Sequence, residues 1–471
     1  MVWDWIIIGS GFGGSVSALR LAEKGYSVLV LEKGRRWETQ DFPKSNWNLK
    51  RWLWIPALGF RGFFKMTFFR HLTALSGVGV GGGSLVYANT LLTPSPKFFQ
   101  GPGWGHLADW EEELEPHYET ARRMLGVAPN PLETSPDRAL KAVAKRMGRS
   151  EHFRPAEVGV YFGEAGVTVK DPYHGGDGPD RTGCTHCGGC MVGCRYGAKN
   201  TLDKNYLWLA EKRGVTVRPD TEATWVRPLD ESSPAPLTHP RFSVSATERR
   251  GVLRKELHEF RARNIVFAGG VLGTVDLLLR LRESPDGLPA LSERVGDRVR
   301  TNSEVLVGIT SRRRDLELAQ GVSITSSLQT DESSSVEPCR YPPGSGFFRL
   351  LITPHAPGES LVQRLGNGLK RIFSSPIQTL RALCIRDFGR YTTALLYMRT
   401  LDGHLRLSAS PGNFRRLGSG LRSEPGDGPV PTASIPEATV LAGEYAREVD
   451  GYVGSLMTET FLGIPTTAHI L

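Results

Sequence analysis

The sequence predicts an α/β fold in which a parallel-sheet domain, assembled from separated segments, is interleaved with an α+β domain built on an antiparallel sheet. Two runs of strand, glycine-rich turn and helix, in residues 5–34 and 264–282, predict the first domain. After about residue 300 the pattern changes to short strands and long loops, and the dipeptide Asp402-Gly403 is typical of a hairpin turn. That change predicts the second domain.

These patterns divide the chain into five segments. Residues 1–105 and 200–300 are expected to form the two parts of the nucleotide-binding domain. Residues 106–199 are an inserted region with two predicted helices and a cysteine cluster. Residues 301–454 are expected to form the substrate-binding domain, and residues 455–471 begin a C-terminal segment.

Composition and charge restrict the class of protein. The 471 residues include 58 Lys and Arg against 49 Asp and Glu, a formal charge of +9. No stretch of 18 apolar residues and no basic leader occur, so we expect a cytoplasmic protein with neither a membrane-spanning helix nor a signal peptide. No zinc-finger, RNP or helix-turn-helix pattern occurs, so we expect no nucleic-acid partner. The basic residues form a solvated face or attract anionic lipid or acidic metabolites.

The first glycine-rich turn has the spacing Gly9-x-Gly11-x-x-Gly14 between a strand and a helix. In such a turn the first glycine allows the tight bend, the second lets a pyrophosphate approach the backbone, and the third lets helix and strand pack closely. Glu32 ends the next strand, where a carboxylate can accept both hydroxyls of an adenosine ribose. The arrangement predicts a Rossmann-like dinucleotide site rather than a mere tight turn.

A second glycine-rich stretch has five glycines within residues 77–83. A backbone with so few side chains lets a flat, bulky group lie against it, and the apolar flanks favour a packed turn over a flexible loop. FAD needs a second contact of this kind because its isoalloxazine lies far from its adenine, so we favour FAD over NAD. The candidate contacts here are Gly79, Gly81, Gly82, Gly83 and Ser84.

Four cysteines fall within eleven residues, in the order Cys184-x2-Cys187-x2-Cys190-x3-Cys194. The spacing is that of a bacterial ferredoxin run, although Arg195 stands where a proline usually follows. An iron–sulfur cluster, another metal and packed free thiols are the alternatives. Such crowding without a signal peptide argues for a reducing compartment and against disulfides.

Six segments spread over the chain resemble the glucose–methanol–choline (GMC) oxidoreductases, and within that family the bacterial cholesterol oxidase branch. The matching segments are 9–16, 78–85, 183–194, 197–202, 268–278 and 466–469. The resemblance implies FAD and the oxidation of a sterol, or a similarly bulky hydrophobic secondary alcohol, with oxygen or an electron carrier as acceptor. The branch often has an Asn three residues after Ser84; Tyr87 stands there, and Asn89 is the candidate flavin contact.

The resemblance also implies catalytic roles for a histidine and a glutamate. His469 would face the flavin and hydrogen-bond the reacting hydroxyl, a task that suits an imidazole near neutral pH. The branch also isomerises the steroid double bond, which needs a base of raised pKa in an apolar pocket. Glu337 lies where the resemblance places that base, and Glu304 is the second candidate. A surface or ion-paired acid is the alternative for either.

The family pattern continues past the position of His469, whereas this sequence stops at Leu471. The resemblance therefore implies that 455–471 starts a catalytic segment that is cut short, which leaves the activity of such a fragment open. Two rival functions remain: a flavin-dependent dehydrogenase that passes electrons to a carrier, and a non-catalytic flavin or iron–sulfur electron-transfer protein.

Two apolar and basic segments are candidates for peripheral membrane contact. Residues 47–72 interleave Trp and Phe with Lys and Arg, and we favour core packing over a lid that dips into a membrane. In residues 361–373 apolar side chains recur at helical spacing, and we favour a core-facing amphipathic helix over a membrane anchor.

Overall fold

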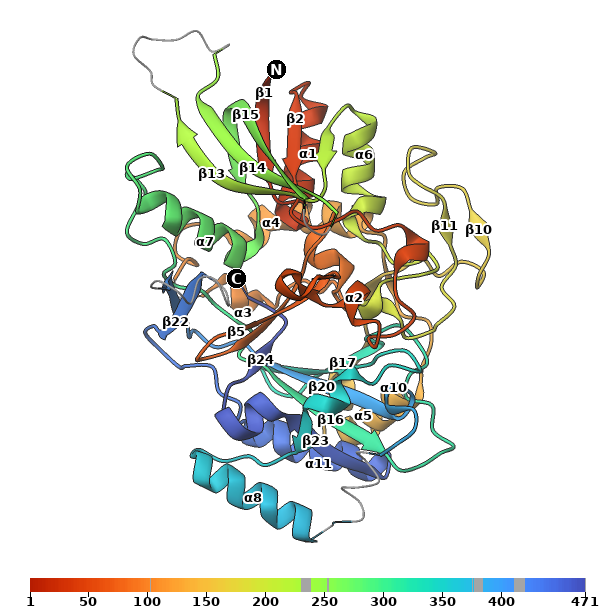
Figure 1. Ribbon diagram of the computed structural model, residues 1–471. Helices are drawn as coiled ribbons and strands as arrows, with labels where there is room; N and C mark the ends of the chain where they lie inside the picture. The colour runs from red at the N-terminus through yellow and green to blue at the C-terminus, as the bar shows by residue number, and fades with distance from the viewer. Residues whose placement is uncertain are drawn as a thin grey trace.

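The computed structural model describes residues 1–101, 103–229, 239–251, 254–374, 376, 384–410 and 420–470. Two large sheets dominate it, one with the N-terminus in the upper half of Figure 1 and one in the lower half. The first sheet has the strand order β12-β2-β1-β15-β14-β13, and the second has the order β19-β23-β16-β20-β18-β17-β8. The predicted α/β class and the antiparallel second sheet are confirmed.

Four parallel strands form the body of the first sheet, and two antiparallel strands extend it. The parallel strands are β1 (Val2–Ile8), β2 (Val28–Leu31), β12 (Thr216–Arg218) and β15 (Arg254–Phe267), and the extension is β13 (Thr221–Pro228) and β14 (Phe242–Arg250). Ile6 of β1 lies opposite Leu29 and Ile265. β1 is therefore central, and its glycine turn lies in the middle of the sheet.

Helices cover both faces of this sheet, because its apolar residues alternate between the faces. Ile7 packs with α1 (Phe12–Glu23) and α6 (Tyr206–Lys212), whereas Ile6 packs with α7 (Gly270–Arg282). The carboxyl ends of β1 and β15 both run into a glycine turn and then a helix. Both predicted strand–turn–helix runs are therefore present, side by side.

The second sheet is antiparallel, and its inner strand β16 (Val305–Ser311) pairs with β20 (Thr392–Arg399) and β23 (Gly451–Leu456). The remaining strands are β18 (Ser334–Cys339), β17 (Ser326–Gln329), β19 (Ile352–Pro354) and β8 (Phe153–Pro155). α5 (Ser135–Arg146) and α11 (Pro436–Glu448) cover one face with an apolar core. The opposite face is left to line a cavity.

A small three-stranded sheet lies between the two large ones (Figure 1). β24 (Thr466–Thr467) pairs in parallel with β6 (Thr73–Gly77), which pairs with β5 (Phe64–Phe68). The C-terminal segment is thus held against the strand that leads into the second glycine turn. That pairing places the C-terminal residues next to the segment of the second glycine turn.

Aromatic side chains of the 47–72 segment fill the space beside this small sheet. Trp52 and Phe63 have no exposed surface, and the Trp52 ring stacks on Phe64 with centroids 4.5 Å apart. Tyr341 and Phe348 close the cluster from the second domain. The core interpretation that we favoured therefore holds for Trp52, Phe63, Phe64 and Phe69, which are buried, but not for Trp47 and Phe68, which are exposed.

The remaining elements surround this framework. They are α2 (Leu49–Trp52), β3 (Trp54–Ile55), β4 (Phe60–Arg61), α3 (Pro96–Phe99), α4 (Trp110–Met124), β7 (Val127–Pro129), β9 (Glu157–Gly159), β10 (Thr168–Val169), β11 (Arg181–Thr182), α8 (Leu361–Ser374), α10 (Phe388–Tyr391), β21 (Leu405–Ala409) and β22 (Leu421–Pro425). Within the described ranges no helix is long and apolar enough to cross a membrane. The prediction that α8 faces the core is wrong, since most of its apolar side chains are exposed.

Candidate active site and cofactor cavity

A cavity of about 1580 Å³ runs from the glycine turns of the first sheet to the open face of the second. Gly9, Gly11 and Glu32 line one end. Glu337 and His469 line the wall that the second sheet and the C-terminal segment supply. One cavity therefore joins the predicted nucleotide residues to two predicted catalytic residues that lie far away in sequence.

The first glycine turn leaves bare backbone on the cavity wall. A Cβ on Gly11 or on Gly13 would meet nothing within 4 Å, whereas a Cβ on Gly14 would lie 2.0 Å from the Gly9 carbonyl oxygen. Gly11 is also the N-cap of α1 and offers no side-chain cap, so the first N–H groups of the helix remain available to an anion. This geometry fits the pyrophosphate of a dinucleotide.

Glu32 is held at the end of β2 by the turn itself. Its Oε2 accepts hydrogen bonds from the Ser10 hydroxyl at 2.7 Å and the Ser10 N–H at 3.2 Å, and its Oε1 accepts from the Gly34 N–H at 2.9 Å. Burial raises the pKa of Glu32. Ser10, which sequence reasoning missed, also accepts from the Gly81 N–H at 3.1 Å and so links both glycine turns.

The second glycine turn packs directly on the first. A Cβ on Gly82 would lie 2.7 Å from the Gly11 Cα, and Gly82 and Gly83 line the cavity. Gly79 and Gly81 have φ of 139° and 102°, which only glycine adopts readily, and they shape the turn without reaching the wall. Ser84 is also internal, because its hydroxyl donates to the Gly81 carbonyl at 2.7 Å.

Asn89 lies behind the cavity wall. Its side chain is fully buried, does not line the cavity and has no hydrogen-bond partner among the described residues. Lys199 is the polar residue that reinforces this region: its Nζ donates to the carbonyl oxygens of Leu85, Tyr87 and Cys190 at 2.7–3.1 Å. Burial lowers the pKa of Lys199 to about 8. The motif containing Lys199 signalled a resemblance, but not this role.

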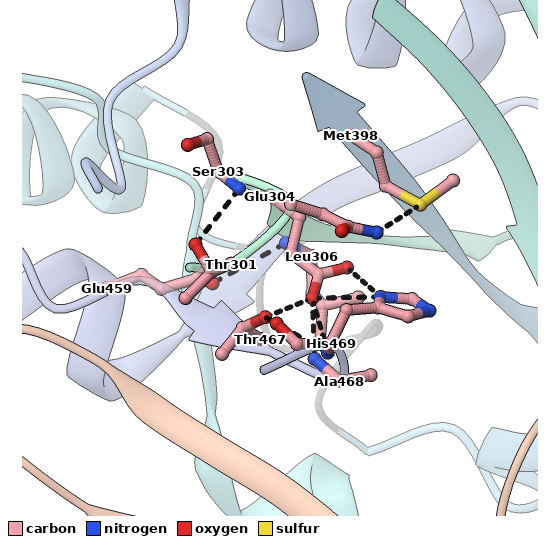
Figure 2. Close-up of polar contacts among 10 residues, drawn as sticks. Thr301, Ser303, Glu304, Leu306, Met398, Glu459, Thr467, Ala468 and His469 are labelled. Carbon is pink, nitrogen blue, oxygen red and sulfur yellow. Dashed lines mark hydrogen bonds and ion pairs between the residues drawn. The ribbon is translucent and has the colours of Figure 1, made fainter. Parts of the chain in front are cut away.

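Glu304 holds His469 in place (Figure 2). Its side chain is completely buried directly before β16, and its Oε1 accepts from the Ala468 N–H at 2.6 Å and the His469 Nδ1 at 3.2 Å. The Thr467 hydroxyl donates to the same oxygen. Nε2 of His469 has no partner among the described residues, and the ring is 44% exposed where it lines the cavity. Glu304 therefore orients the imidazole and leaves Nε2 free.

The two predicted carboxylates occupy different positions. Glu337, on β18, lines the cavity and is only 3% exposed, and its Oε1 has no partner among the described residues. Glu304 lies behind His469 and does not line the cavity. Burial raises the pKa of Glu337 to about 7, with the negative charge of Glu304 adding to it and His469 opposing it. Of the two, only Glu337 reaches the cavity.

The environment of His469 acts on its pKa in two directions. Burial lowers it, but the charge of Glu304 and the hydrogen bond to it outweigh burial, so the pKa lies above its ordinary value. A third buried acid, which sequence reasoning missed, stands nearby. Glu459 accepts from the Thr466 N–H at 3.2 Å and the Leu306 N–H at 3.5 Å, and so ties β24 to β16. No sequence signal marks it.

The cysteine cluster lies beside the cavity wall: Met191, between two of its cysteines, lines the cavity, but none of the four cysteines does. Cys184 and Cys190 are buried in an apolar core, and the Cys184 sulfur accepts from the His186 N–H at 3.4 Å. Burial raises the pKa of Cys184 and of Cys187, which favours thiols over thiolates. The described part of the chain contains no group of three or more His, Cys, Asp or Glu side chains arranged to hold a metal ion. Of the three alternatives for these cysteines, the iron–sulfur cluster is therefore not supported.

Comparison with known proteins agrees with this geometry. Residues 7–42 match the model of the NAD(P)-binding Rossmann-like domain. The whole chain is 40% identical to a cholesterol oxidase of Acinetobacter baumannii, over 84% of that protein, and 42% identical to one of Mycobacterium tuberculosis, over 81% of it. Pyridoxine 4-oxidase from Mesorbium loti shares the fold, with a TM-score of 0.52 at 15% identity over 95% of this chain and 79% of that one.

Proposed function

This chain belongs to the glucose–methanol–choline oxidoreductases, in their cholesterol oxidase branch, and we propose that it oxidises the hydroxyl of a sterol or similarly bulky hydrophobic secondary alcohol to the ketone. FAD is the cofactor and oxygen the final acceptor, which is reduced to hydrogen peroxide. One observation carries the proposal: Glu304 holds the His469 imidazole through Nδ1 and leaves Nε2 free. His469 lines the same cavity as residues of both glycine turns.

The residues of the nucleotide end fit FAD. The bare backbone at Gly11 and Gly13, with the N-terminus of α1, would receive the pyrophosphate, and Glu32 would accept the adenosine ribose hydroxyls. Gly82 and Gly83 would lie against the flavin part. When bound, FAD supplies the acceptor for the hydride that leaves the alcohol carbon.

His469 handles the hydroxyl proton. Because Glu304 accepts from Nδ1, the neutral imidazole carries its proton there and presents the lone pair of Nε2 to the cavity. Nε2 accepts the hydrogen bond of the substrate hydroxyl, orients its C–H bond and takes the proton as the carbonyl forms. Glu304 stabilises the imidazolium that results, as the raised pKa of His469 reflects.

Glu337 serves a second step, movement of the double bond in the steroid ketone. Its buried carboxyl lines the cavity, and its pKa of about 7 lets it accept a proton from carbon and return it to another carbon near neutral pH. This arrangement favours Glu337 over Glu304 as the isomerisation base. Glu304 is instead a positioning residue for His469.

The test is made on the purified chain. We expect denaturation to release FAD, identified by its chromatographic retention and fluorescence, and cholesterol to yield ketone and hydrogen peroxide in equal amounts. Release of a nicotinamide dinucleotide alone would overturn the cofactor assignment. Ketone formed only with an added electron carrier, without peroxide, would make the protein a dehydrogenase.

A further inference from the structure

Met191 places a thioether on the wall of the cavity. It lies within the cysteine run, after Cys190, and its sulfur accepts a hydrogen bond from the Cys339 thiol, with the two sulfur atoms 3.6 Å apart. Cys339 and Glu337 are two residues apart on β18, so they lie on the same face of the strand, and both line the cavity. Met191 is therefore a neighbour of the strand face that carries the proposed isomerisation base.

The backbone beside Met191 is also tied to the segment of the second glycine turn. Lys199 donates from Nζ to the carbonyl oxygens of Leu85 and Tyr87, which follow that turn. The same Nζ donates to the carbonyl oxygen of Cys190, the residue before Met191. One buried ammonium thus holds this part of the cysteine run against the segment that we assign to the flavin. Met191 lies where that segment meets β18.

Of the two sulfur atoms, the thioether is the one that an oxidant in the cavity attacks. Hydrogen peroxide reacts with a thiolate rather than a thiol, and burial raises the pKa of Cys339 to about 12, so its thiol keeps its proton. A thioether reacts without losing a proton. The hydrogen bond from Cys339 uses one lone pair of the Met191 sulfur and leaves the other free.

The proposed function supplies an oxidant in the same space. Oxidation of the alcohol by oxygen yields hydrogen peroxide at every turnover, inside the cavity that Met191 lines. One molecule confined to about 1580 Å³ corresponds to a concentration of about 1 M. That concentration is far above what the same peroxide gives after it escapes into solution. A methionine on this wall is therefore oxidised ahead of methionines on the outer surface.

We propose that Met191 is a modification site, at which hydrogen peroxide made in the cavity converts the thioether to the sulfoxide. A sulfur lone pair attacks one peroxide oxygen and the O–O bond breaks. The hydroxide that leaves takes the proton from the oxygen now bound to sulfur and departs as water. Sulfur loses two electrons and the peroxide gains them, so no further reactant is needed. The inference rests on the proposed function for the source of the peroxide.

The sulfoxide changes the wall against which a sterol lies. Met191 and Cys339 pack in one apolar cluster with Ile324 and Leu396, which also line the cavity. Oxidation places a polar oxygen among these residues, which weakens their contact with an apolar ring system. The rate of alcohol oxidation should therefore decline as turnovers accumulate, and Met191 makes the activity self-limiting.

The experiment follows the seven methionines by peptide mass spectrometry. In one sample the FAD-bound protein oxidises cholesterol in air with catalase present, which destroys the peroxide that leaves the protein. A parallel sample without catalase measures how much peroxide forms. In a third sample, peroxide is added to protein that is given no alcohol. Met147, which is 42% exposed, is the internal reference.

We expect the ratio of Met191 sulfoxide to Met147 sulfoxide to be roughly tenfold or more higher during turnover with catalase than with added peroxide, because only peroxide made in the cavity escapes catalase. Equal ratios in the two samples would overturn the proposal. Oxidation of Cys339 in place of Met191 would also overturn it.

A pair of variants tests the consequence for activity. Met191→Leu nearly conserves the volume of the side chain and cannot form a sulfoxide, and Met147→Leu is the matched control. Each rate is divided by its own initial value, with catalase present throughout. We expect the unchanged protein and Met147→Leu to lose activity over successive turnovers and Met191→Leu to retain it. An equal decline in all three proteins would overturn the self-limiting role of Met191.

A sample without alcohol separates the modification site from the proposed substrate. Light and EDTA reduce the bound FAD, and air reoxidises it with formation of peroxide. If cholesterol yields no peroxide but this cycle oxidises Met191 ahead of Met147, the proposed substrate fails and the modification site stands. If cholesterol yields peroxide and neither treatment oxidises Met191, the modification site fails and the proposed function stands.

Discussion

The two ends of the cavity differ in which protein atoms line them. The nucleotide end is backbone: Gly11, Gly13 and Gly82 expose peptide groups where side chains would otherwise project. The catalytic end consists of side chains: His469, which the buried Glu304 orients, and Glu337 present titratable groups to the cavity. Substitutions that add a side chain should therefore disrupt ligand binding at the nucleotide end. Substitutions that remove a functional group should instead disrupt the chemistry at the catalytic end.

The largest expected effect comes from adding atoms at the nucleotide end. In Gly11→Val the new side chain would occupy open space that we assign to the pyrophosphate, so the protein should fold but lose FAD and with it all activity. Flavin absorbance after purification measures the loss. Gly443→Val is the control, since Gly443 of α11 also has nothing within 4 Å of its Cβ position and lies outside the cavity wall. Retention of FAD by Gly11→Val would show that the space beside Gly11 does not receive the pyrophosphate, and the contrast between the two ends of the cavity would fail.

Removing atoms at the catalytic end should leave FAD bound. In His469→Ala, Glu304 keeps hydrogen bonds from the N–H of Ala468 and the hydroxyl of Thr467, so the local fold should persist. We expect flavin reduction by alcohol to slow by about 10²–10⁴-fold, the usual contribution of a general base. Stopped-flow absorbance measures it, with the exposed His106→Ala as control. An unchanged reduction rate would remove His469 from the mechanism.

Glu304→Gln should have a smaller effect on rate and a distinct effect on pH dependence. Glu304 raises the pKa of His469 against the lowering effect of burial, so without its charge the imidazole should lose its proton at a lower pH. The acid limb of the reduction rate should therefore move to lower pH, and the rate should fall less than in His469→Ala. A profile that keeps its position while the rate falls would reduce Glu304 to a structural role.

The difference between the two ends also explains what the sequence could predict. The nucleotide end depends on residues close in sequence, so the spacing of Gly9, Gly11 and Gly14 indicated it directly. The catalytic end joins residues from β18, the start of β16 and the C-terminal segment, which only the folded sheets bring together. The resemblance placed His469 and Glu337 there and gave Glu304 as the second candidate for the base, but only the fold shows that Glu304 lies behind the imidazole.

The pattern of apolar and basic residues likewise could not predict which side chains of residues 47–72 and of α8 are buried. The aromatic segment 47–72 and helix α8 both carry apolar side chains among cations, yet Trp52 is fully buried and Phe373 is almost fully exposed. Apolar residues at helical spacing show that a helix has an apolar side. They do not show whether that apolar side faces the core or the solvent, because contacts made by the polar side can decide the orientation. In α8, Arg364 and Arg371 donate hydrogen bonds to the carbonyl oxygens of Thr460 and His355, which lie outside the helix. No local sequence pattern could therefore reveal that the arginines face the protein and the apolar side faces the solvent.

The smallest effect on alcohol oxidation is expected at Glu337. Glu337→Gln keeps the shape of the side chain and leaves His469 and Glu304 in place, so ketone should form at about the rate of the unchanged protein. Because an amide cannot accept a proton from carbon, the unconjugated ketone should accumulate. Ultraviolet absorbance of the conjugated enone measures this step, and Glu332→Gln, at a side chain that is 90% exposed, is the control. Normal enone formation would exclude Glu337.

A stability measurement sharpens the same prediction. Burial raises the pKa of Glu337 from 4.5 to about 7, so the folded state binds this proton more tightly than the unfolded chain does. The stability linked to that proton is fully present below pH 4.5 and is lost as the pH rises through 7. Glu337→Gln removes the loss, so its melting temperature relative to the unchanged protein should rise between about pH 5 and about pH 8. A melting difference that stays constant over this range would mean that Glu337 is not the buried, proton-binding acid that isomerisation requires, whatever the product assay shows.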